Sequence, residues 1–256
     1  MKTSLLTLVL SCFFLNLTQA QDTEYPLFEK HIYKTETAPL YYRLLKPKNL
    51  DTSQTYPLVL FLHGAGERGT DNEITLNHID KLFLNEENRE KYPCYVLVPQ
   101  CPKEKRWVEV HWGLDSHSQP EEPSFAMQAT SDLLKEIIQA HPIDTQKLYI
   151  TGLSMGGYGT WDMISRYPDL FAAAAPICGG GDEAQASKIT QIPIWAFHGD
   201  RDRVVKVERT RNMIRAIEAE GGKPKYTEYE GVGHGSWIPA YKEKQFLEWM
   251  FGQVKE

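Results

Sequence analysis

The stretch that decides the fold is residues 147–161, which reads KLYITGLSMGGYGTW. Its first part, residues 148–151, is β-branched and aromatic, which predicts a buried strand. Residues 152–156 then spell G-x-S-x-G, and the residues after them predict a helix that ends before Pro168. A strand, a tight turn and a helix in this order are the setting in which a serine, here Ser154, acts as a nucleophile.

The residue types in this turn have physical reasons. A sharp strand-to-helix turn holds Ser154 in a strained backbone conformation and lifts its hydroxyl above the sheet. Glycine is needed at Gly152 and Gly156, because a Cβ there would press on a neighbouring strand or helix. The amide of Met155 begins the helix, so we expect it to donate to an oxyanion. A glycine-rich connection with an incidental serine is the alternative reading of the motif alone.

A second glycine-rich loop follows residues 57–62, a nearly all-apolar run that predicts a strand covered on both faces. This loop, residues 63–69, reads HGAGERG. Small residues after a buried strand let a backbone amide approach a substrate closely. We expect the amide of Ala65 to be the second oxyanion donor, since in folds where a serine occupies a strand-to-helix turn of this kind the second donor comes from a loop after another strand. Glu67 and Arg68 are expected to brace the loop as an ion pair, with contact to the substrate as the alternative.

A serine nucleophile needs a base within hydrogen-bond reach, and the base needs an orienting acid. In folds with this turn the chain order is serine, acid, histidine. His234 lies in the small-residue loop GVGHG after the last predicted strand, and we assign it as the base. Asp200 and Asp202 both lie in HGDRDRVV after another apolar strand, so either is a candidate acid.

Strands that alternate with helices, most of them wholly apolar, predict one α/β domain with a mainly parallel sheet and helices on both faces. We expect no separate lid domain. Further strands are expected at residues 95–99, 171–177, 192–197 and 225–229, after a hairpin at 31–37 and 40–46. Helices are expected at residues 125–140, 205–220 and 241–254, with a short or irregular piece at 80–89.

The whole set of motifs, LHGAGERG, PQCP, GLSMGGYGTW, PICGGGD and HGDRDRVV, resembles the α/β-hydrolase superfamily over essentially all of the mature chain. It is most similar to single-domain secreted bacterial esterases, a group that includes "predicted peptidases" and phospholipase/carboxylesterase-like proteins and overlaps with feruloyl and acetyl-xylan esterases. In the H-G-x-x-D-x-x-V motif of that group the acid is the aspartate three residues after glycine, which implies Asp202. Asp200 would then shape the turn. The resemblance implies two-step acyl transfer by Ser154 and His234, with no metal or cofactor.

The composition is typical of a globular domain. The chain has 256 residues, 41% hydrophobic and 24% charged, which fits one domain with a sizeable core. The net charge of -6 comes without any basic stripe, so we expect no nucleic-acid partner. The oligomeric state is left open by the sequence.

Residues 1–20 are predicted to be a signal peptide, and residues 21–256 the hydrolase domain. Lys2 gives a positive start, residues 5–17 are mostly apolar, and Ala20 supplies the small residue of a cleavage site. The apolar run is too short to span a bilayer, although an uncleaved anchor is the alternative. We therefore expect export to the periplasm or the medium, with no membrane partner after cleavage.

Three cysteines remain after the leader, an odd number that leaves at least one thiol unpaired. Cys94 and Cys101 bracket a predicted strand, and seven extended residues span about 23 Å, beyond bridging range. Cys101 and Cys178 both follow strands near one sheet edge. A disulfide between them and buried free thiols are both consistent with this placement.

The remaining histidines of interest lie in one long loop or directly after strands. His111, Asp115 and His117 lie in one loop, but no second cluster completes a metal site, so none is expected. His63 and His198 directly follow strands, and we interpret both as structural.

Aromatic residues near the predicted site indicate the class of substrate. Trp107 and Trp112 lie in the long loop 102–123, and Trp237 follows the predicted base. They predict a stacking surface for a sugar ring or an aromatic acyl group, with core packing as the alternative. We expect a serine hydrolase of carboxylic esters, acting on carbohydrate or phenolic esters such as acetyl or feruloyl groups on plant polysaccharide. A serine peptidase for short peptides and a non-catalytic binding module are the competing hypotheses; the complete serine, aspartate and histidine set argues against the second.

Overall fold

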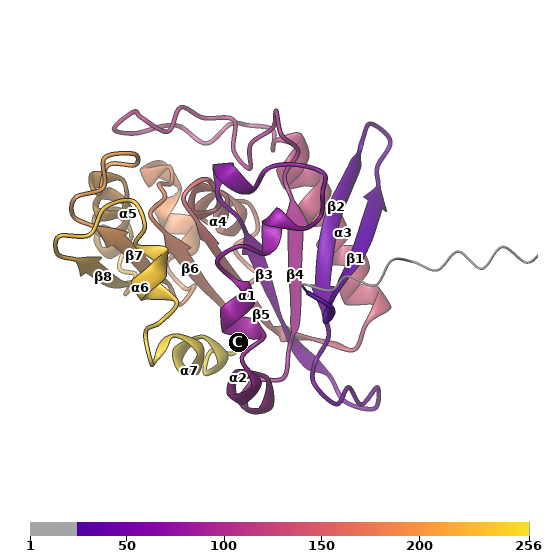
Figure 1. Ribbon diagram of the computed structural model, residues 1–256. Helices are drawn as coiled ribbons and strands as arrows, with labels where there is room; N and C mark the ends of the chain where they lie inside the picture. The colour runs from indigo at the N-terminus through magenta and orange to yellow at the C-terminus, as the bar shows by residue number, and fades with distance from the viewer. Residues whose placement is uncertain (1–24, 256) are drawn as a thin grey trace, which may run out of the picture.

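A computed structural model describes residues 25–255, so the predicted signal peptide at 1–20 lies outside the described residues. One eight-stranded sheet runs through the molecule in the order β1-β2-β4-β3-β5-β6-β7-β8 (Figure 1). The strands are β1 (Phe28–Lys34), β2 (Pro39–Leu45), β3 (Tyr56–Leu62), β4 (Tyr95–Gln100), β5 (Ile143–Leu153), β6 (Ala173–Ile177), β7 (Trp195–Gly199) and β8 (Lys225–Tyr229). β3 to β8 pair in parallel, whereas β1 and β2 form an antiparallel hairpin whose second strand pairs antiparallel with β4.

Helices cover both faces of this sheet, as predicted. They are α1 (Asp80–Phe83), α2 (Glu86–Lys91), α3 (Phe125–Ala140), α4 (Met155–Arg166), α5 (Glu208–Ala219), α6 (Trp237–Ala240) and α7 (Phe246–Phe251), with short 3-10 turns η1 (Ala65–Glu67), η2 (Ile74–Leu76) and η3 (Glu183–Ile189). Figure 1 shows α1, α6 and α7 on the near side of the sheet and α3, α4 and α5 on the far side.

The strands alternate their side chains between two cores, one on each face. Leu58 and Leu60 of β3 pack with buried residues of α3, α4 and α5. Val59 and Phe61 of the same strand pack with buried residues of α1, α6 and α7. Both faces of β3 are therefore buried, which explains why its sequence is nearly all apolar.

Several predicted elements differ in their bounds; the strands expected at residues 31–37 and 192–197, for example, are Phe28–Lys34 and Trp195–Gly199. The helix expected at residues 241–254 is shorter than predicted: residues 241–245 form a turn after α6, where the ring of Tyr241 packs edge-on against Phe61 and Phe246, and α7 covers only Phe246–Phe251. The helix expected from Val205 begins at Glu208, because the amide of Val205 donates to a side chain of the preceding turn. The strand before the serine starts earlier than expected, at Ile143.

The three cysteines of the described chain are free and buried. A disulfide between Cys101 and Cys178, one of the two alternatives that the sequence left open, is therefore wrong. Burial raises the pKa of each thiol to about 12, so all three are held protonated and behave as small apolar side chains.

Within residues 25–255, no helix combines the length and the apolar character that crossing a bilayer would need.

Candidate active site

Ser154 stands at the turn between β5 and α4, at the carboxyl end of a central strand. Its φ of 54° and ψ of -117° lie in a region that a residue with a side chain rarely adopts. A Cβ on Gly156 would lie 1.8 Å from the carbonyl oxygen of Leu62, and one on Gly152 would lie 2.4 Å from the carbonyl oxygen of Gly156. The expected role of both glycines is confirmed: without side chains, they let α4 pack closely against β3 and β5 at the turn that carries Ser154.

Ser154, His234 and Asp202 form a continuous hydrogen-bonded chain. The hydroxyl oxygen of Ser154 lies 2.8 Å from Nε2 of His234, and Nδ1 of His234 lies 2.7 Å from Oδ2 of Asp202. An ionised carboxylate only accepts hydrogen bonds, so Nδ1 carries the ring proton and Nε2 presents its lone pair to the hydroxyl. This is the arrangement in which the imidazole can remove the serine proton.

The environment of Asp202 keeps its carboxylate ionised. Its side chain is fully buried, and Oδ1 accepts hydrogen bonds from the amides of Val204 at 2.8 Å and Val205 at 2.9 Å. Burial alone would raise its pKa, but the hydrogen bonds from His198, from His234 and from the two amides together hold the pKa well below its usual range. The acid therefore stays negative beside the imidazole at any pH at which the imidazole acts as a base.

The structure separates the two candidate acids. Asp202, not Asp200, lies against His234. Oδ1 of Asp200 instead accepts a hydrogen bond from the amide of Gly231 at 2.7 Å, which ties the turn after β7 to the turn after β8. This is the turn-shaping role that the resemblance implied for Asp200.

His198 has a contact that sequence reasoning missed. Its ring is fully buried, and Nε2 lies 3.0 Å from the carbonyl oxygen of Val205 and 3.2 Å from Oδ2 of Asp202. Both partners are acceptors, so Nε2 carries a proton. The interpretation of His198 as purely structural is therefore incomplete, because it contacts the acid of the triad. The signal lay in its position four residues before Asp202, at the end of a strand.

The two candidate oxyanion donors begin helical turns beside the serine. Met155 is the first residue of α4 and Ala65 the first residue of η1, and the first amides of a helix have no acceptor within the helix. The loop that carries Ala65 lies close to the nucleophile, since a Cβ on Gly64 would be 3.7 Å from that of Ser154. The arrangement suits two main-chain donors on one side of the hydroxyl.

A buried histidine fixes this loop. The amide of Cys101 donates to Nε2 of His63 at 2.9 Å, so Nδ1 carries the proton and donates to the carbonyl oxygen of Gly64 at 2.6 Å. The indole N–H of Trp107 donates to the carbonyl oxygen of His63 at 2.9 Å. Burial lowers the pKa of His63 to about 4, so its ring is neutral and locks the position of Gly64. The structural role expected for His63 is thus seen in detail.

Arg68 braces the same loop through the main chain. Its Nε donates to the carbonyl oxygen of Ala65 at 2.9 Å. The carboxylate of Glu67 lies 3.7 Å from the ring nitrogen of His78 instead of pairing with Arg68. The expected bracing is present, but the two side chains act separately.

The three tryptophans predicted to contact substrate have different surroundings. Trp107 is fully buried, so the prediction that it stacks on a ligand is wrong, and the core-packing alternative holds. Trp112 is half-buried, with the guanidinium of Arg106 4.5 Å above its ring. The ring of Trp237 meets that of His234 edge-on, with the centroids 5.4 Å apart. Trp237 is thus the tryptophan that adjoins the base.

The loop residues considered for metal binding have other partners. Asp115 pairs with Lys206, and the ring of His117 faces Arg209. Within residues 25–255, one group of potential ligands is close enough to share an ion: Cys178, Asp202 and His234, with ligand atoms within 4.8 Å of one another. Two of these are already hydrogen-bonded to each other in the triad, and burial keeps the third protonated. The group therefore consists of two triad residues and a buried thiol beside them.

The chain resembles a solved esterase over most of its length. The crystal structure of a thermostable esterase superposes with a TM-score of 0.84 at 40% identity, over 90% of this chain and 64% of that one. Solved ferulic acid and feruloyl esterases superpose with a TM-score of 0.65 at 16% identity, which shows a shared fold.

Two curated relatives match shorter segments. Poly(3-hydroxyalkanoate) depolymerase C of Paucimonas lemoignei is 55% identical over 100 residues, which are 39% of this chain and 24% of the relative. The bifunctional acetylxylan esterase/xylanase of Neocallimastix patriciarum is 32% identical over 89 residues, 34% of this chain and 13% of the relative. The chain thus spans about a quarter or less of the length of these relatives.

Residues 117–244 match the model of the Dienelactone hydrolase family. The match takes in half of the chain and includes the serine, the aspartate and the histidine that the structure brings together. This chain belongs to the dienelactone hydrolase family, within the α/β-hydrolase superfamily.

Proposed function

We propose that this protein is a serine-dependent hydrolase of carboxylic esters, with Ser154 as nucleophile, His234 as general base and acid, and Asp202 as the orienting acid. The observation that carries this proposal is the unbroken chain of hydrogen bonds from the serine hydroxyl through the imidazole to a buried, ionised carboxylate. Every element of that chain is needed to make an alcohol nucleophilic at neutral pH.

The first half-reaction forms an acyl-enzyme. Nε2 of His234 takes the hydroxyl proton while Oγ of Ser154 attacks the ester carbonyl carbon. The amides of Met155 and Ala65 stabilise the oxyanion, each by roughly 3 kcal/mol. When the bond from carbon to the alcohol oxygen breaks, the imidazolium gives its proton to that oxygen, and the alcohol departs.

The second half-reaction returns the enzyme to its starting state. His234 takes a proton from a water molecule, whose oxygen attacks the acyl carbon. The bond to Ser154 then breaks, its Oγ recovers the proton from Nε2, and the carboxylic acid leaves. In each half-reaction His234 takes one proton and gives it back, so the cycle consumes only the ester and one water molecule.

For the substrate we propose an acyl ester of a carbohydrate, such as an acetyl or feruloyl group on plant polysaccharide. Supporting this choice are the acetylxylan esterase/xylanase relative and the feruloyl esterases that share the fold. The 55% identity to a poly(3-hydroxyalkanoate) depolymerase favours a second candidate, an ester bond between hydroxyacid units. Both candidates use the same acyl-transfer chemistry and differ in the alcohol that leaves.

Parallel assays test the activity and the substrate class. We expect turnover of p-nitrophenyl acetate and release of acetate from acetylated xylan or of ferulate from methyl ferulate. The Ser154→Ala variant should lose all of these, and a fluorophosphonate probe should label the unmodified protein at Ser154. Turnover of poly(3-hydroxybutyrate) alone would select the second candidate. Hydrolysis of an aminoacyl anilide without ester turnover would select the peptidase, and absence of labelling would favour a non-catalytic module.

We also propose export, with residues 1–20 removed as a signal peptide. The support is the charged start, the apolar run and the small residue at position 20. Amino-terminal sequencing of the protein recovered outside the cytoplasm should begin at Gln21; an intact amino terminus would contradict cleavage.

A further inference from the structure

A groove lies beside the triad, between the segment 78–88 and helix α6. We call it the α1–α6 groove; its volume is about 450 Å³, within the range of small-molecule sites. Its lining includes His78, Asp80, Asn85, Trp237, Ile238 and Tyr241. Figure 1 shows the flanking helices α1 and α6 on the same side of the sheet.

Trp237 is the wall that the groove shares with the catalytic site. Its ring lines the groove, meets the ring of His234 with centroids 5.4 Å apart, and meets the ring of His78 with centroids 5.3 Å apart. His78 in turn lies 3.7 Å from Glu67 of the loop that carries Ala65. The ring of Trp237 therefore stands between the groove and the base, and the contact of His78 with Glu67 links the groove to the candidate oxyanion loop.

The proton transfer from His234 decides which part of the ester lies on the side of the groove. The imidazole of His234 gives its proton to the leaving alcohol oxygen, so the alcohol portion of the substrate must sit next to that ring. The carbonyl oxygen points instead to the amides of Met155 and Ala65. A groove that begins at Trp237, against the ring of His234, is therefore placed for the alcohol portion.

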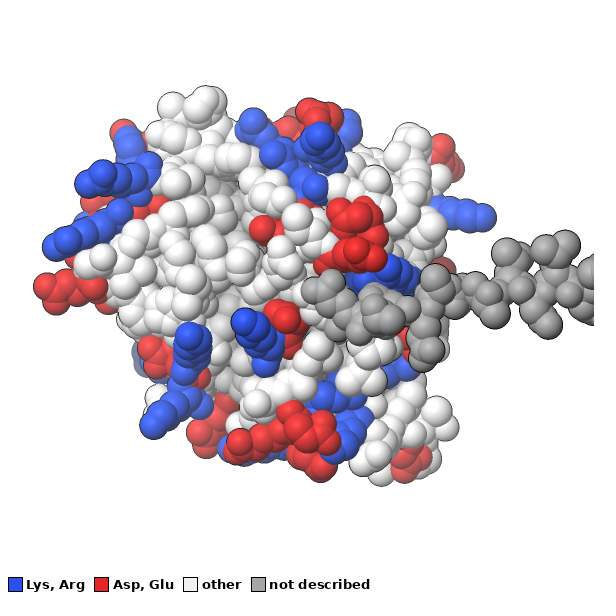
Figure 2. Space-filling view, in the orientation of Figure 1, with Lys and Arg blue, Asp and Glu red and all other residues white. Residues whose placement is uncertain are grey.

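The lining chemistry fits a ligand rich in hydroxyl groups. The ring of Trp237 and the exposed Ile238 offer apolar surface. The carboxylate of Asp80 accepts hydrogen bonds, and the side-chain NH2 of Asn85 donates them, while the oxygen of Asn85 accepts from the amide of Asn88 at 3.0 Å. Charges of both signs border the groove, since Lys81 and Lys242 face it together with Asp80. Figure 2 shows basic and acidic side chains in the middle of the same face as well as along its margins, with uncharged surface between them. A sugar, with apolar C–H faces and hydroxyls that donate and accept, matches this mixture.

We propose that the α1–α6 groove binds the alcohol portion of the substrate, a neutral oligosaccharide chain that carries the ester. This inference rests on the proposed esterase function and extends it from the acyl group to the carrier. Trp237 separates the groove from the base, so a sugar that stacks there extends the chain away from the scissile bond.

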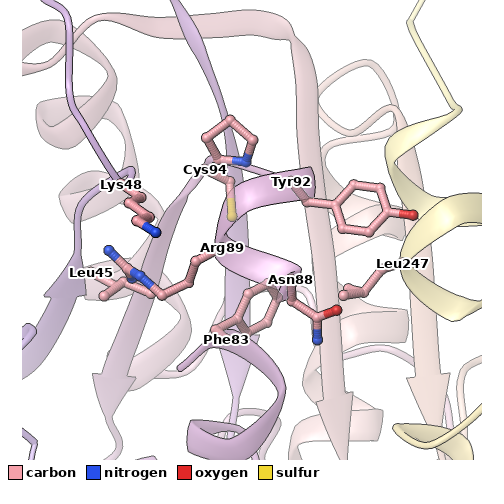
Figure 3. Close-up of a pocket in the computed structure, with 9 residues that line it drawn as sticks. Leu45, Lys48, Phe83, Asn88, Arg89, Tyr92, Cys94 and Leu247 are labelled. Carbon is pink, nitrogen blue, oxygen red and sulfur yellow. The ribbon is translucent and has the colours of Figure 1, made fainter. Parts of the chain in front are cut away.

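Three other hollows on the described surface lack this relationship to the triad. Two of similar volume, about 470 and 400 Å³, are lined by residues such as Arg166 and Lys188 or Lys30 and Asp71, with neither Trp237 nor a triad residue among them. A third, shown in Figure 3 with Cys94 and Arg89 in its lining, holds only about 10 Å³, the space of a single water molecule. It lies beside the residue that precedes β4, at the amino end of that strand, whereas Ser154 follows the carboxyl end of β5.

Binding to a protein that cannot turn over tests the groove without relying on catalysis. Calorimetry with xylohexaose should show saturable binding to the Ser154→Ala protein. Adding Trp237→Ala or Asp80→Ala should weaken that binding at least about tenfold, the change that corresponds to 1.4 kcal/mol. The matched control is Asp132→Ala, which removes an acid of similar kind from the exposed face of α3, and it should leave the affinity unchanged.

The outcomes separate the groove from the proposed function. No saturable binding, or equal affinity in all four proteins, overturns the groove as the carrier site. If the unmodified protein nevertheless hydrolyses p-nitrophenyl acetate, the esterase proposal stands and the groove alone is rejected. Absence of ester turnover with intact, groove-dependent xylohexaose binding would reject the esterase and keep the carbohydrate site.

Discussion

Nε2 of His198 lies 3.2 Å from Oδ2 of Asp202, the same carboxylate oxygen that accepts the hydrogen bond from His234 at 2.7 Å. The other oxygen is held by two backbone amides. The carboxylate is therefore fixed by two imidazoles and by its own turn, and a fixed carboxylate keeps the proton of His234 on Nδ1, as general-base catalysis requires. His198 acts on the reaction through Asp202, so it is a positioning residue.

Removing the donor of His198 should lower kcat more than it changes KM. A hydrogen bond to a charged group contributes about 1.5–3 kcal/mol, so His198→Phe is expected to reduce kcat roughly tenfold to a hundredfold. His198→Gln, whose amide restores a donor, should recover most of the loss. Equal kcat values for His198→Phe and the unmodified protein, measured with p-nitrophenyl acetate, would show that the contact has no catalytic consequence. A loss in both variants that follows their urea midpoints would assign His198 to stability alone.

The two neighbouring aspartates should respond very differently to the same substitution. Asp202→Asn removes the acceptor that holds the tautomer of His234 and is expected to lower kcat about ten-thousandfold. Asp200→Asn keeps an oxygen for the amide of Gly231 and should retain most of the activity, with a small loss of stability. The comparison is internally controlled, since both changes replace an acid with its amide in one turn. Comparable losses in the two variants would contradict the assignment of Asp202.

Sequence alone predicted the parts of this molecule that depend on local chemistry. The turn around Ser154 is specified by two glycines whose Cβ atoms would collide with the backbone, and such a constraint is visible in one short motif. The strand of residues 57–62 is apolar on both faces because both faces are buried, so the parallel sheet and its two layers of helices followed from composition.

Contacts between distant segments were not predictable in this way. Trp107 follows the loop-like sequence after β4, yet its indole donates to the carbonyl oxygen of His63 in the core. Its burial depends on where the loop 101–124 folds back, which no local pattern encodes. The contact of His198 with Asp202 depends on a turn whose hydrogen bonds delay the start of α5 to Glu208. Trp107 and His198 both lie near predicted site motifs in the sequence. Only the tertiary packing shows that His198 contacts Asp202 of the triad, whereas Trp107 is buried in the core.

The buried ring of His63 should make stability depend on pH. Its pKa is lowered to about 4 in the folded chain, against an ordinary value of 6.5. Between these two values the unfolded chain binds a proton that the folded chain does not, so unfolding becomes easier as the pH falls. The stability is fully present above pH 6.5, and the loss from this group is at most about 1.4 kcal/mol per pH unit down to about pH 4.

Urea unfolding at several pH values between 4 and 7.5 measures this effect. His63→Gln keeps one donor and one acceptor but does not titrate, so its free energy of unfolding should fall less steeply below pH 6.5. His117, whose pKa is also lowered to about 4 by burial and the neighbouring Arg209, is present in both proteins and cancels in the difference. Parallel curves for the two proteins would show that His63 is not held neutral by the fold.

Two glycines near the site offer a matched test of backbone packing. A Cβ on Gly156 would lie 1.8 Å from the carbonyl oxygen of Leu62. No side-chain rotation can relieve this contact, because the backbone fixes the position of the Cβ and the oxygen is itself a backbone atom. Gly156→Ala is therefore expected to lose several kcal/mol of stability or to fail to fold, the usual result of a forced overlap in a packed region. In contrast, Gly66 has nothing within 4 Å of an added Cβ. The free energy of unfolding of Gly66→Ala should therefore lie within about 1 kcal/mol of that of the unmodified protein. Thermal and urea unfolding measure both. A Gly156→Ala protein as stable as Gly66→Ala would mean that β3 and α4 are not pressed together at the turn that holds Ser154.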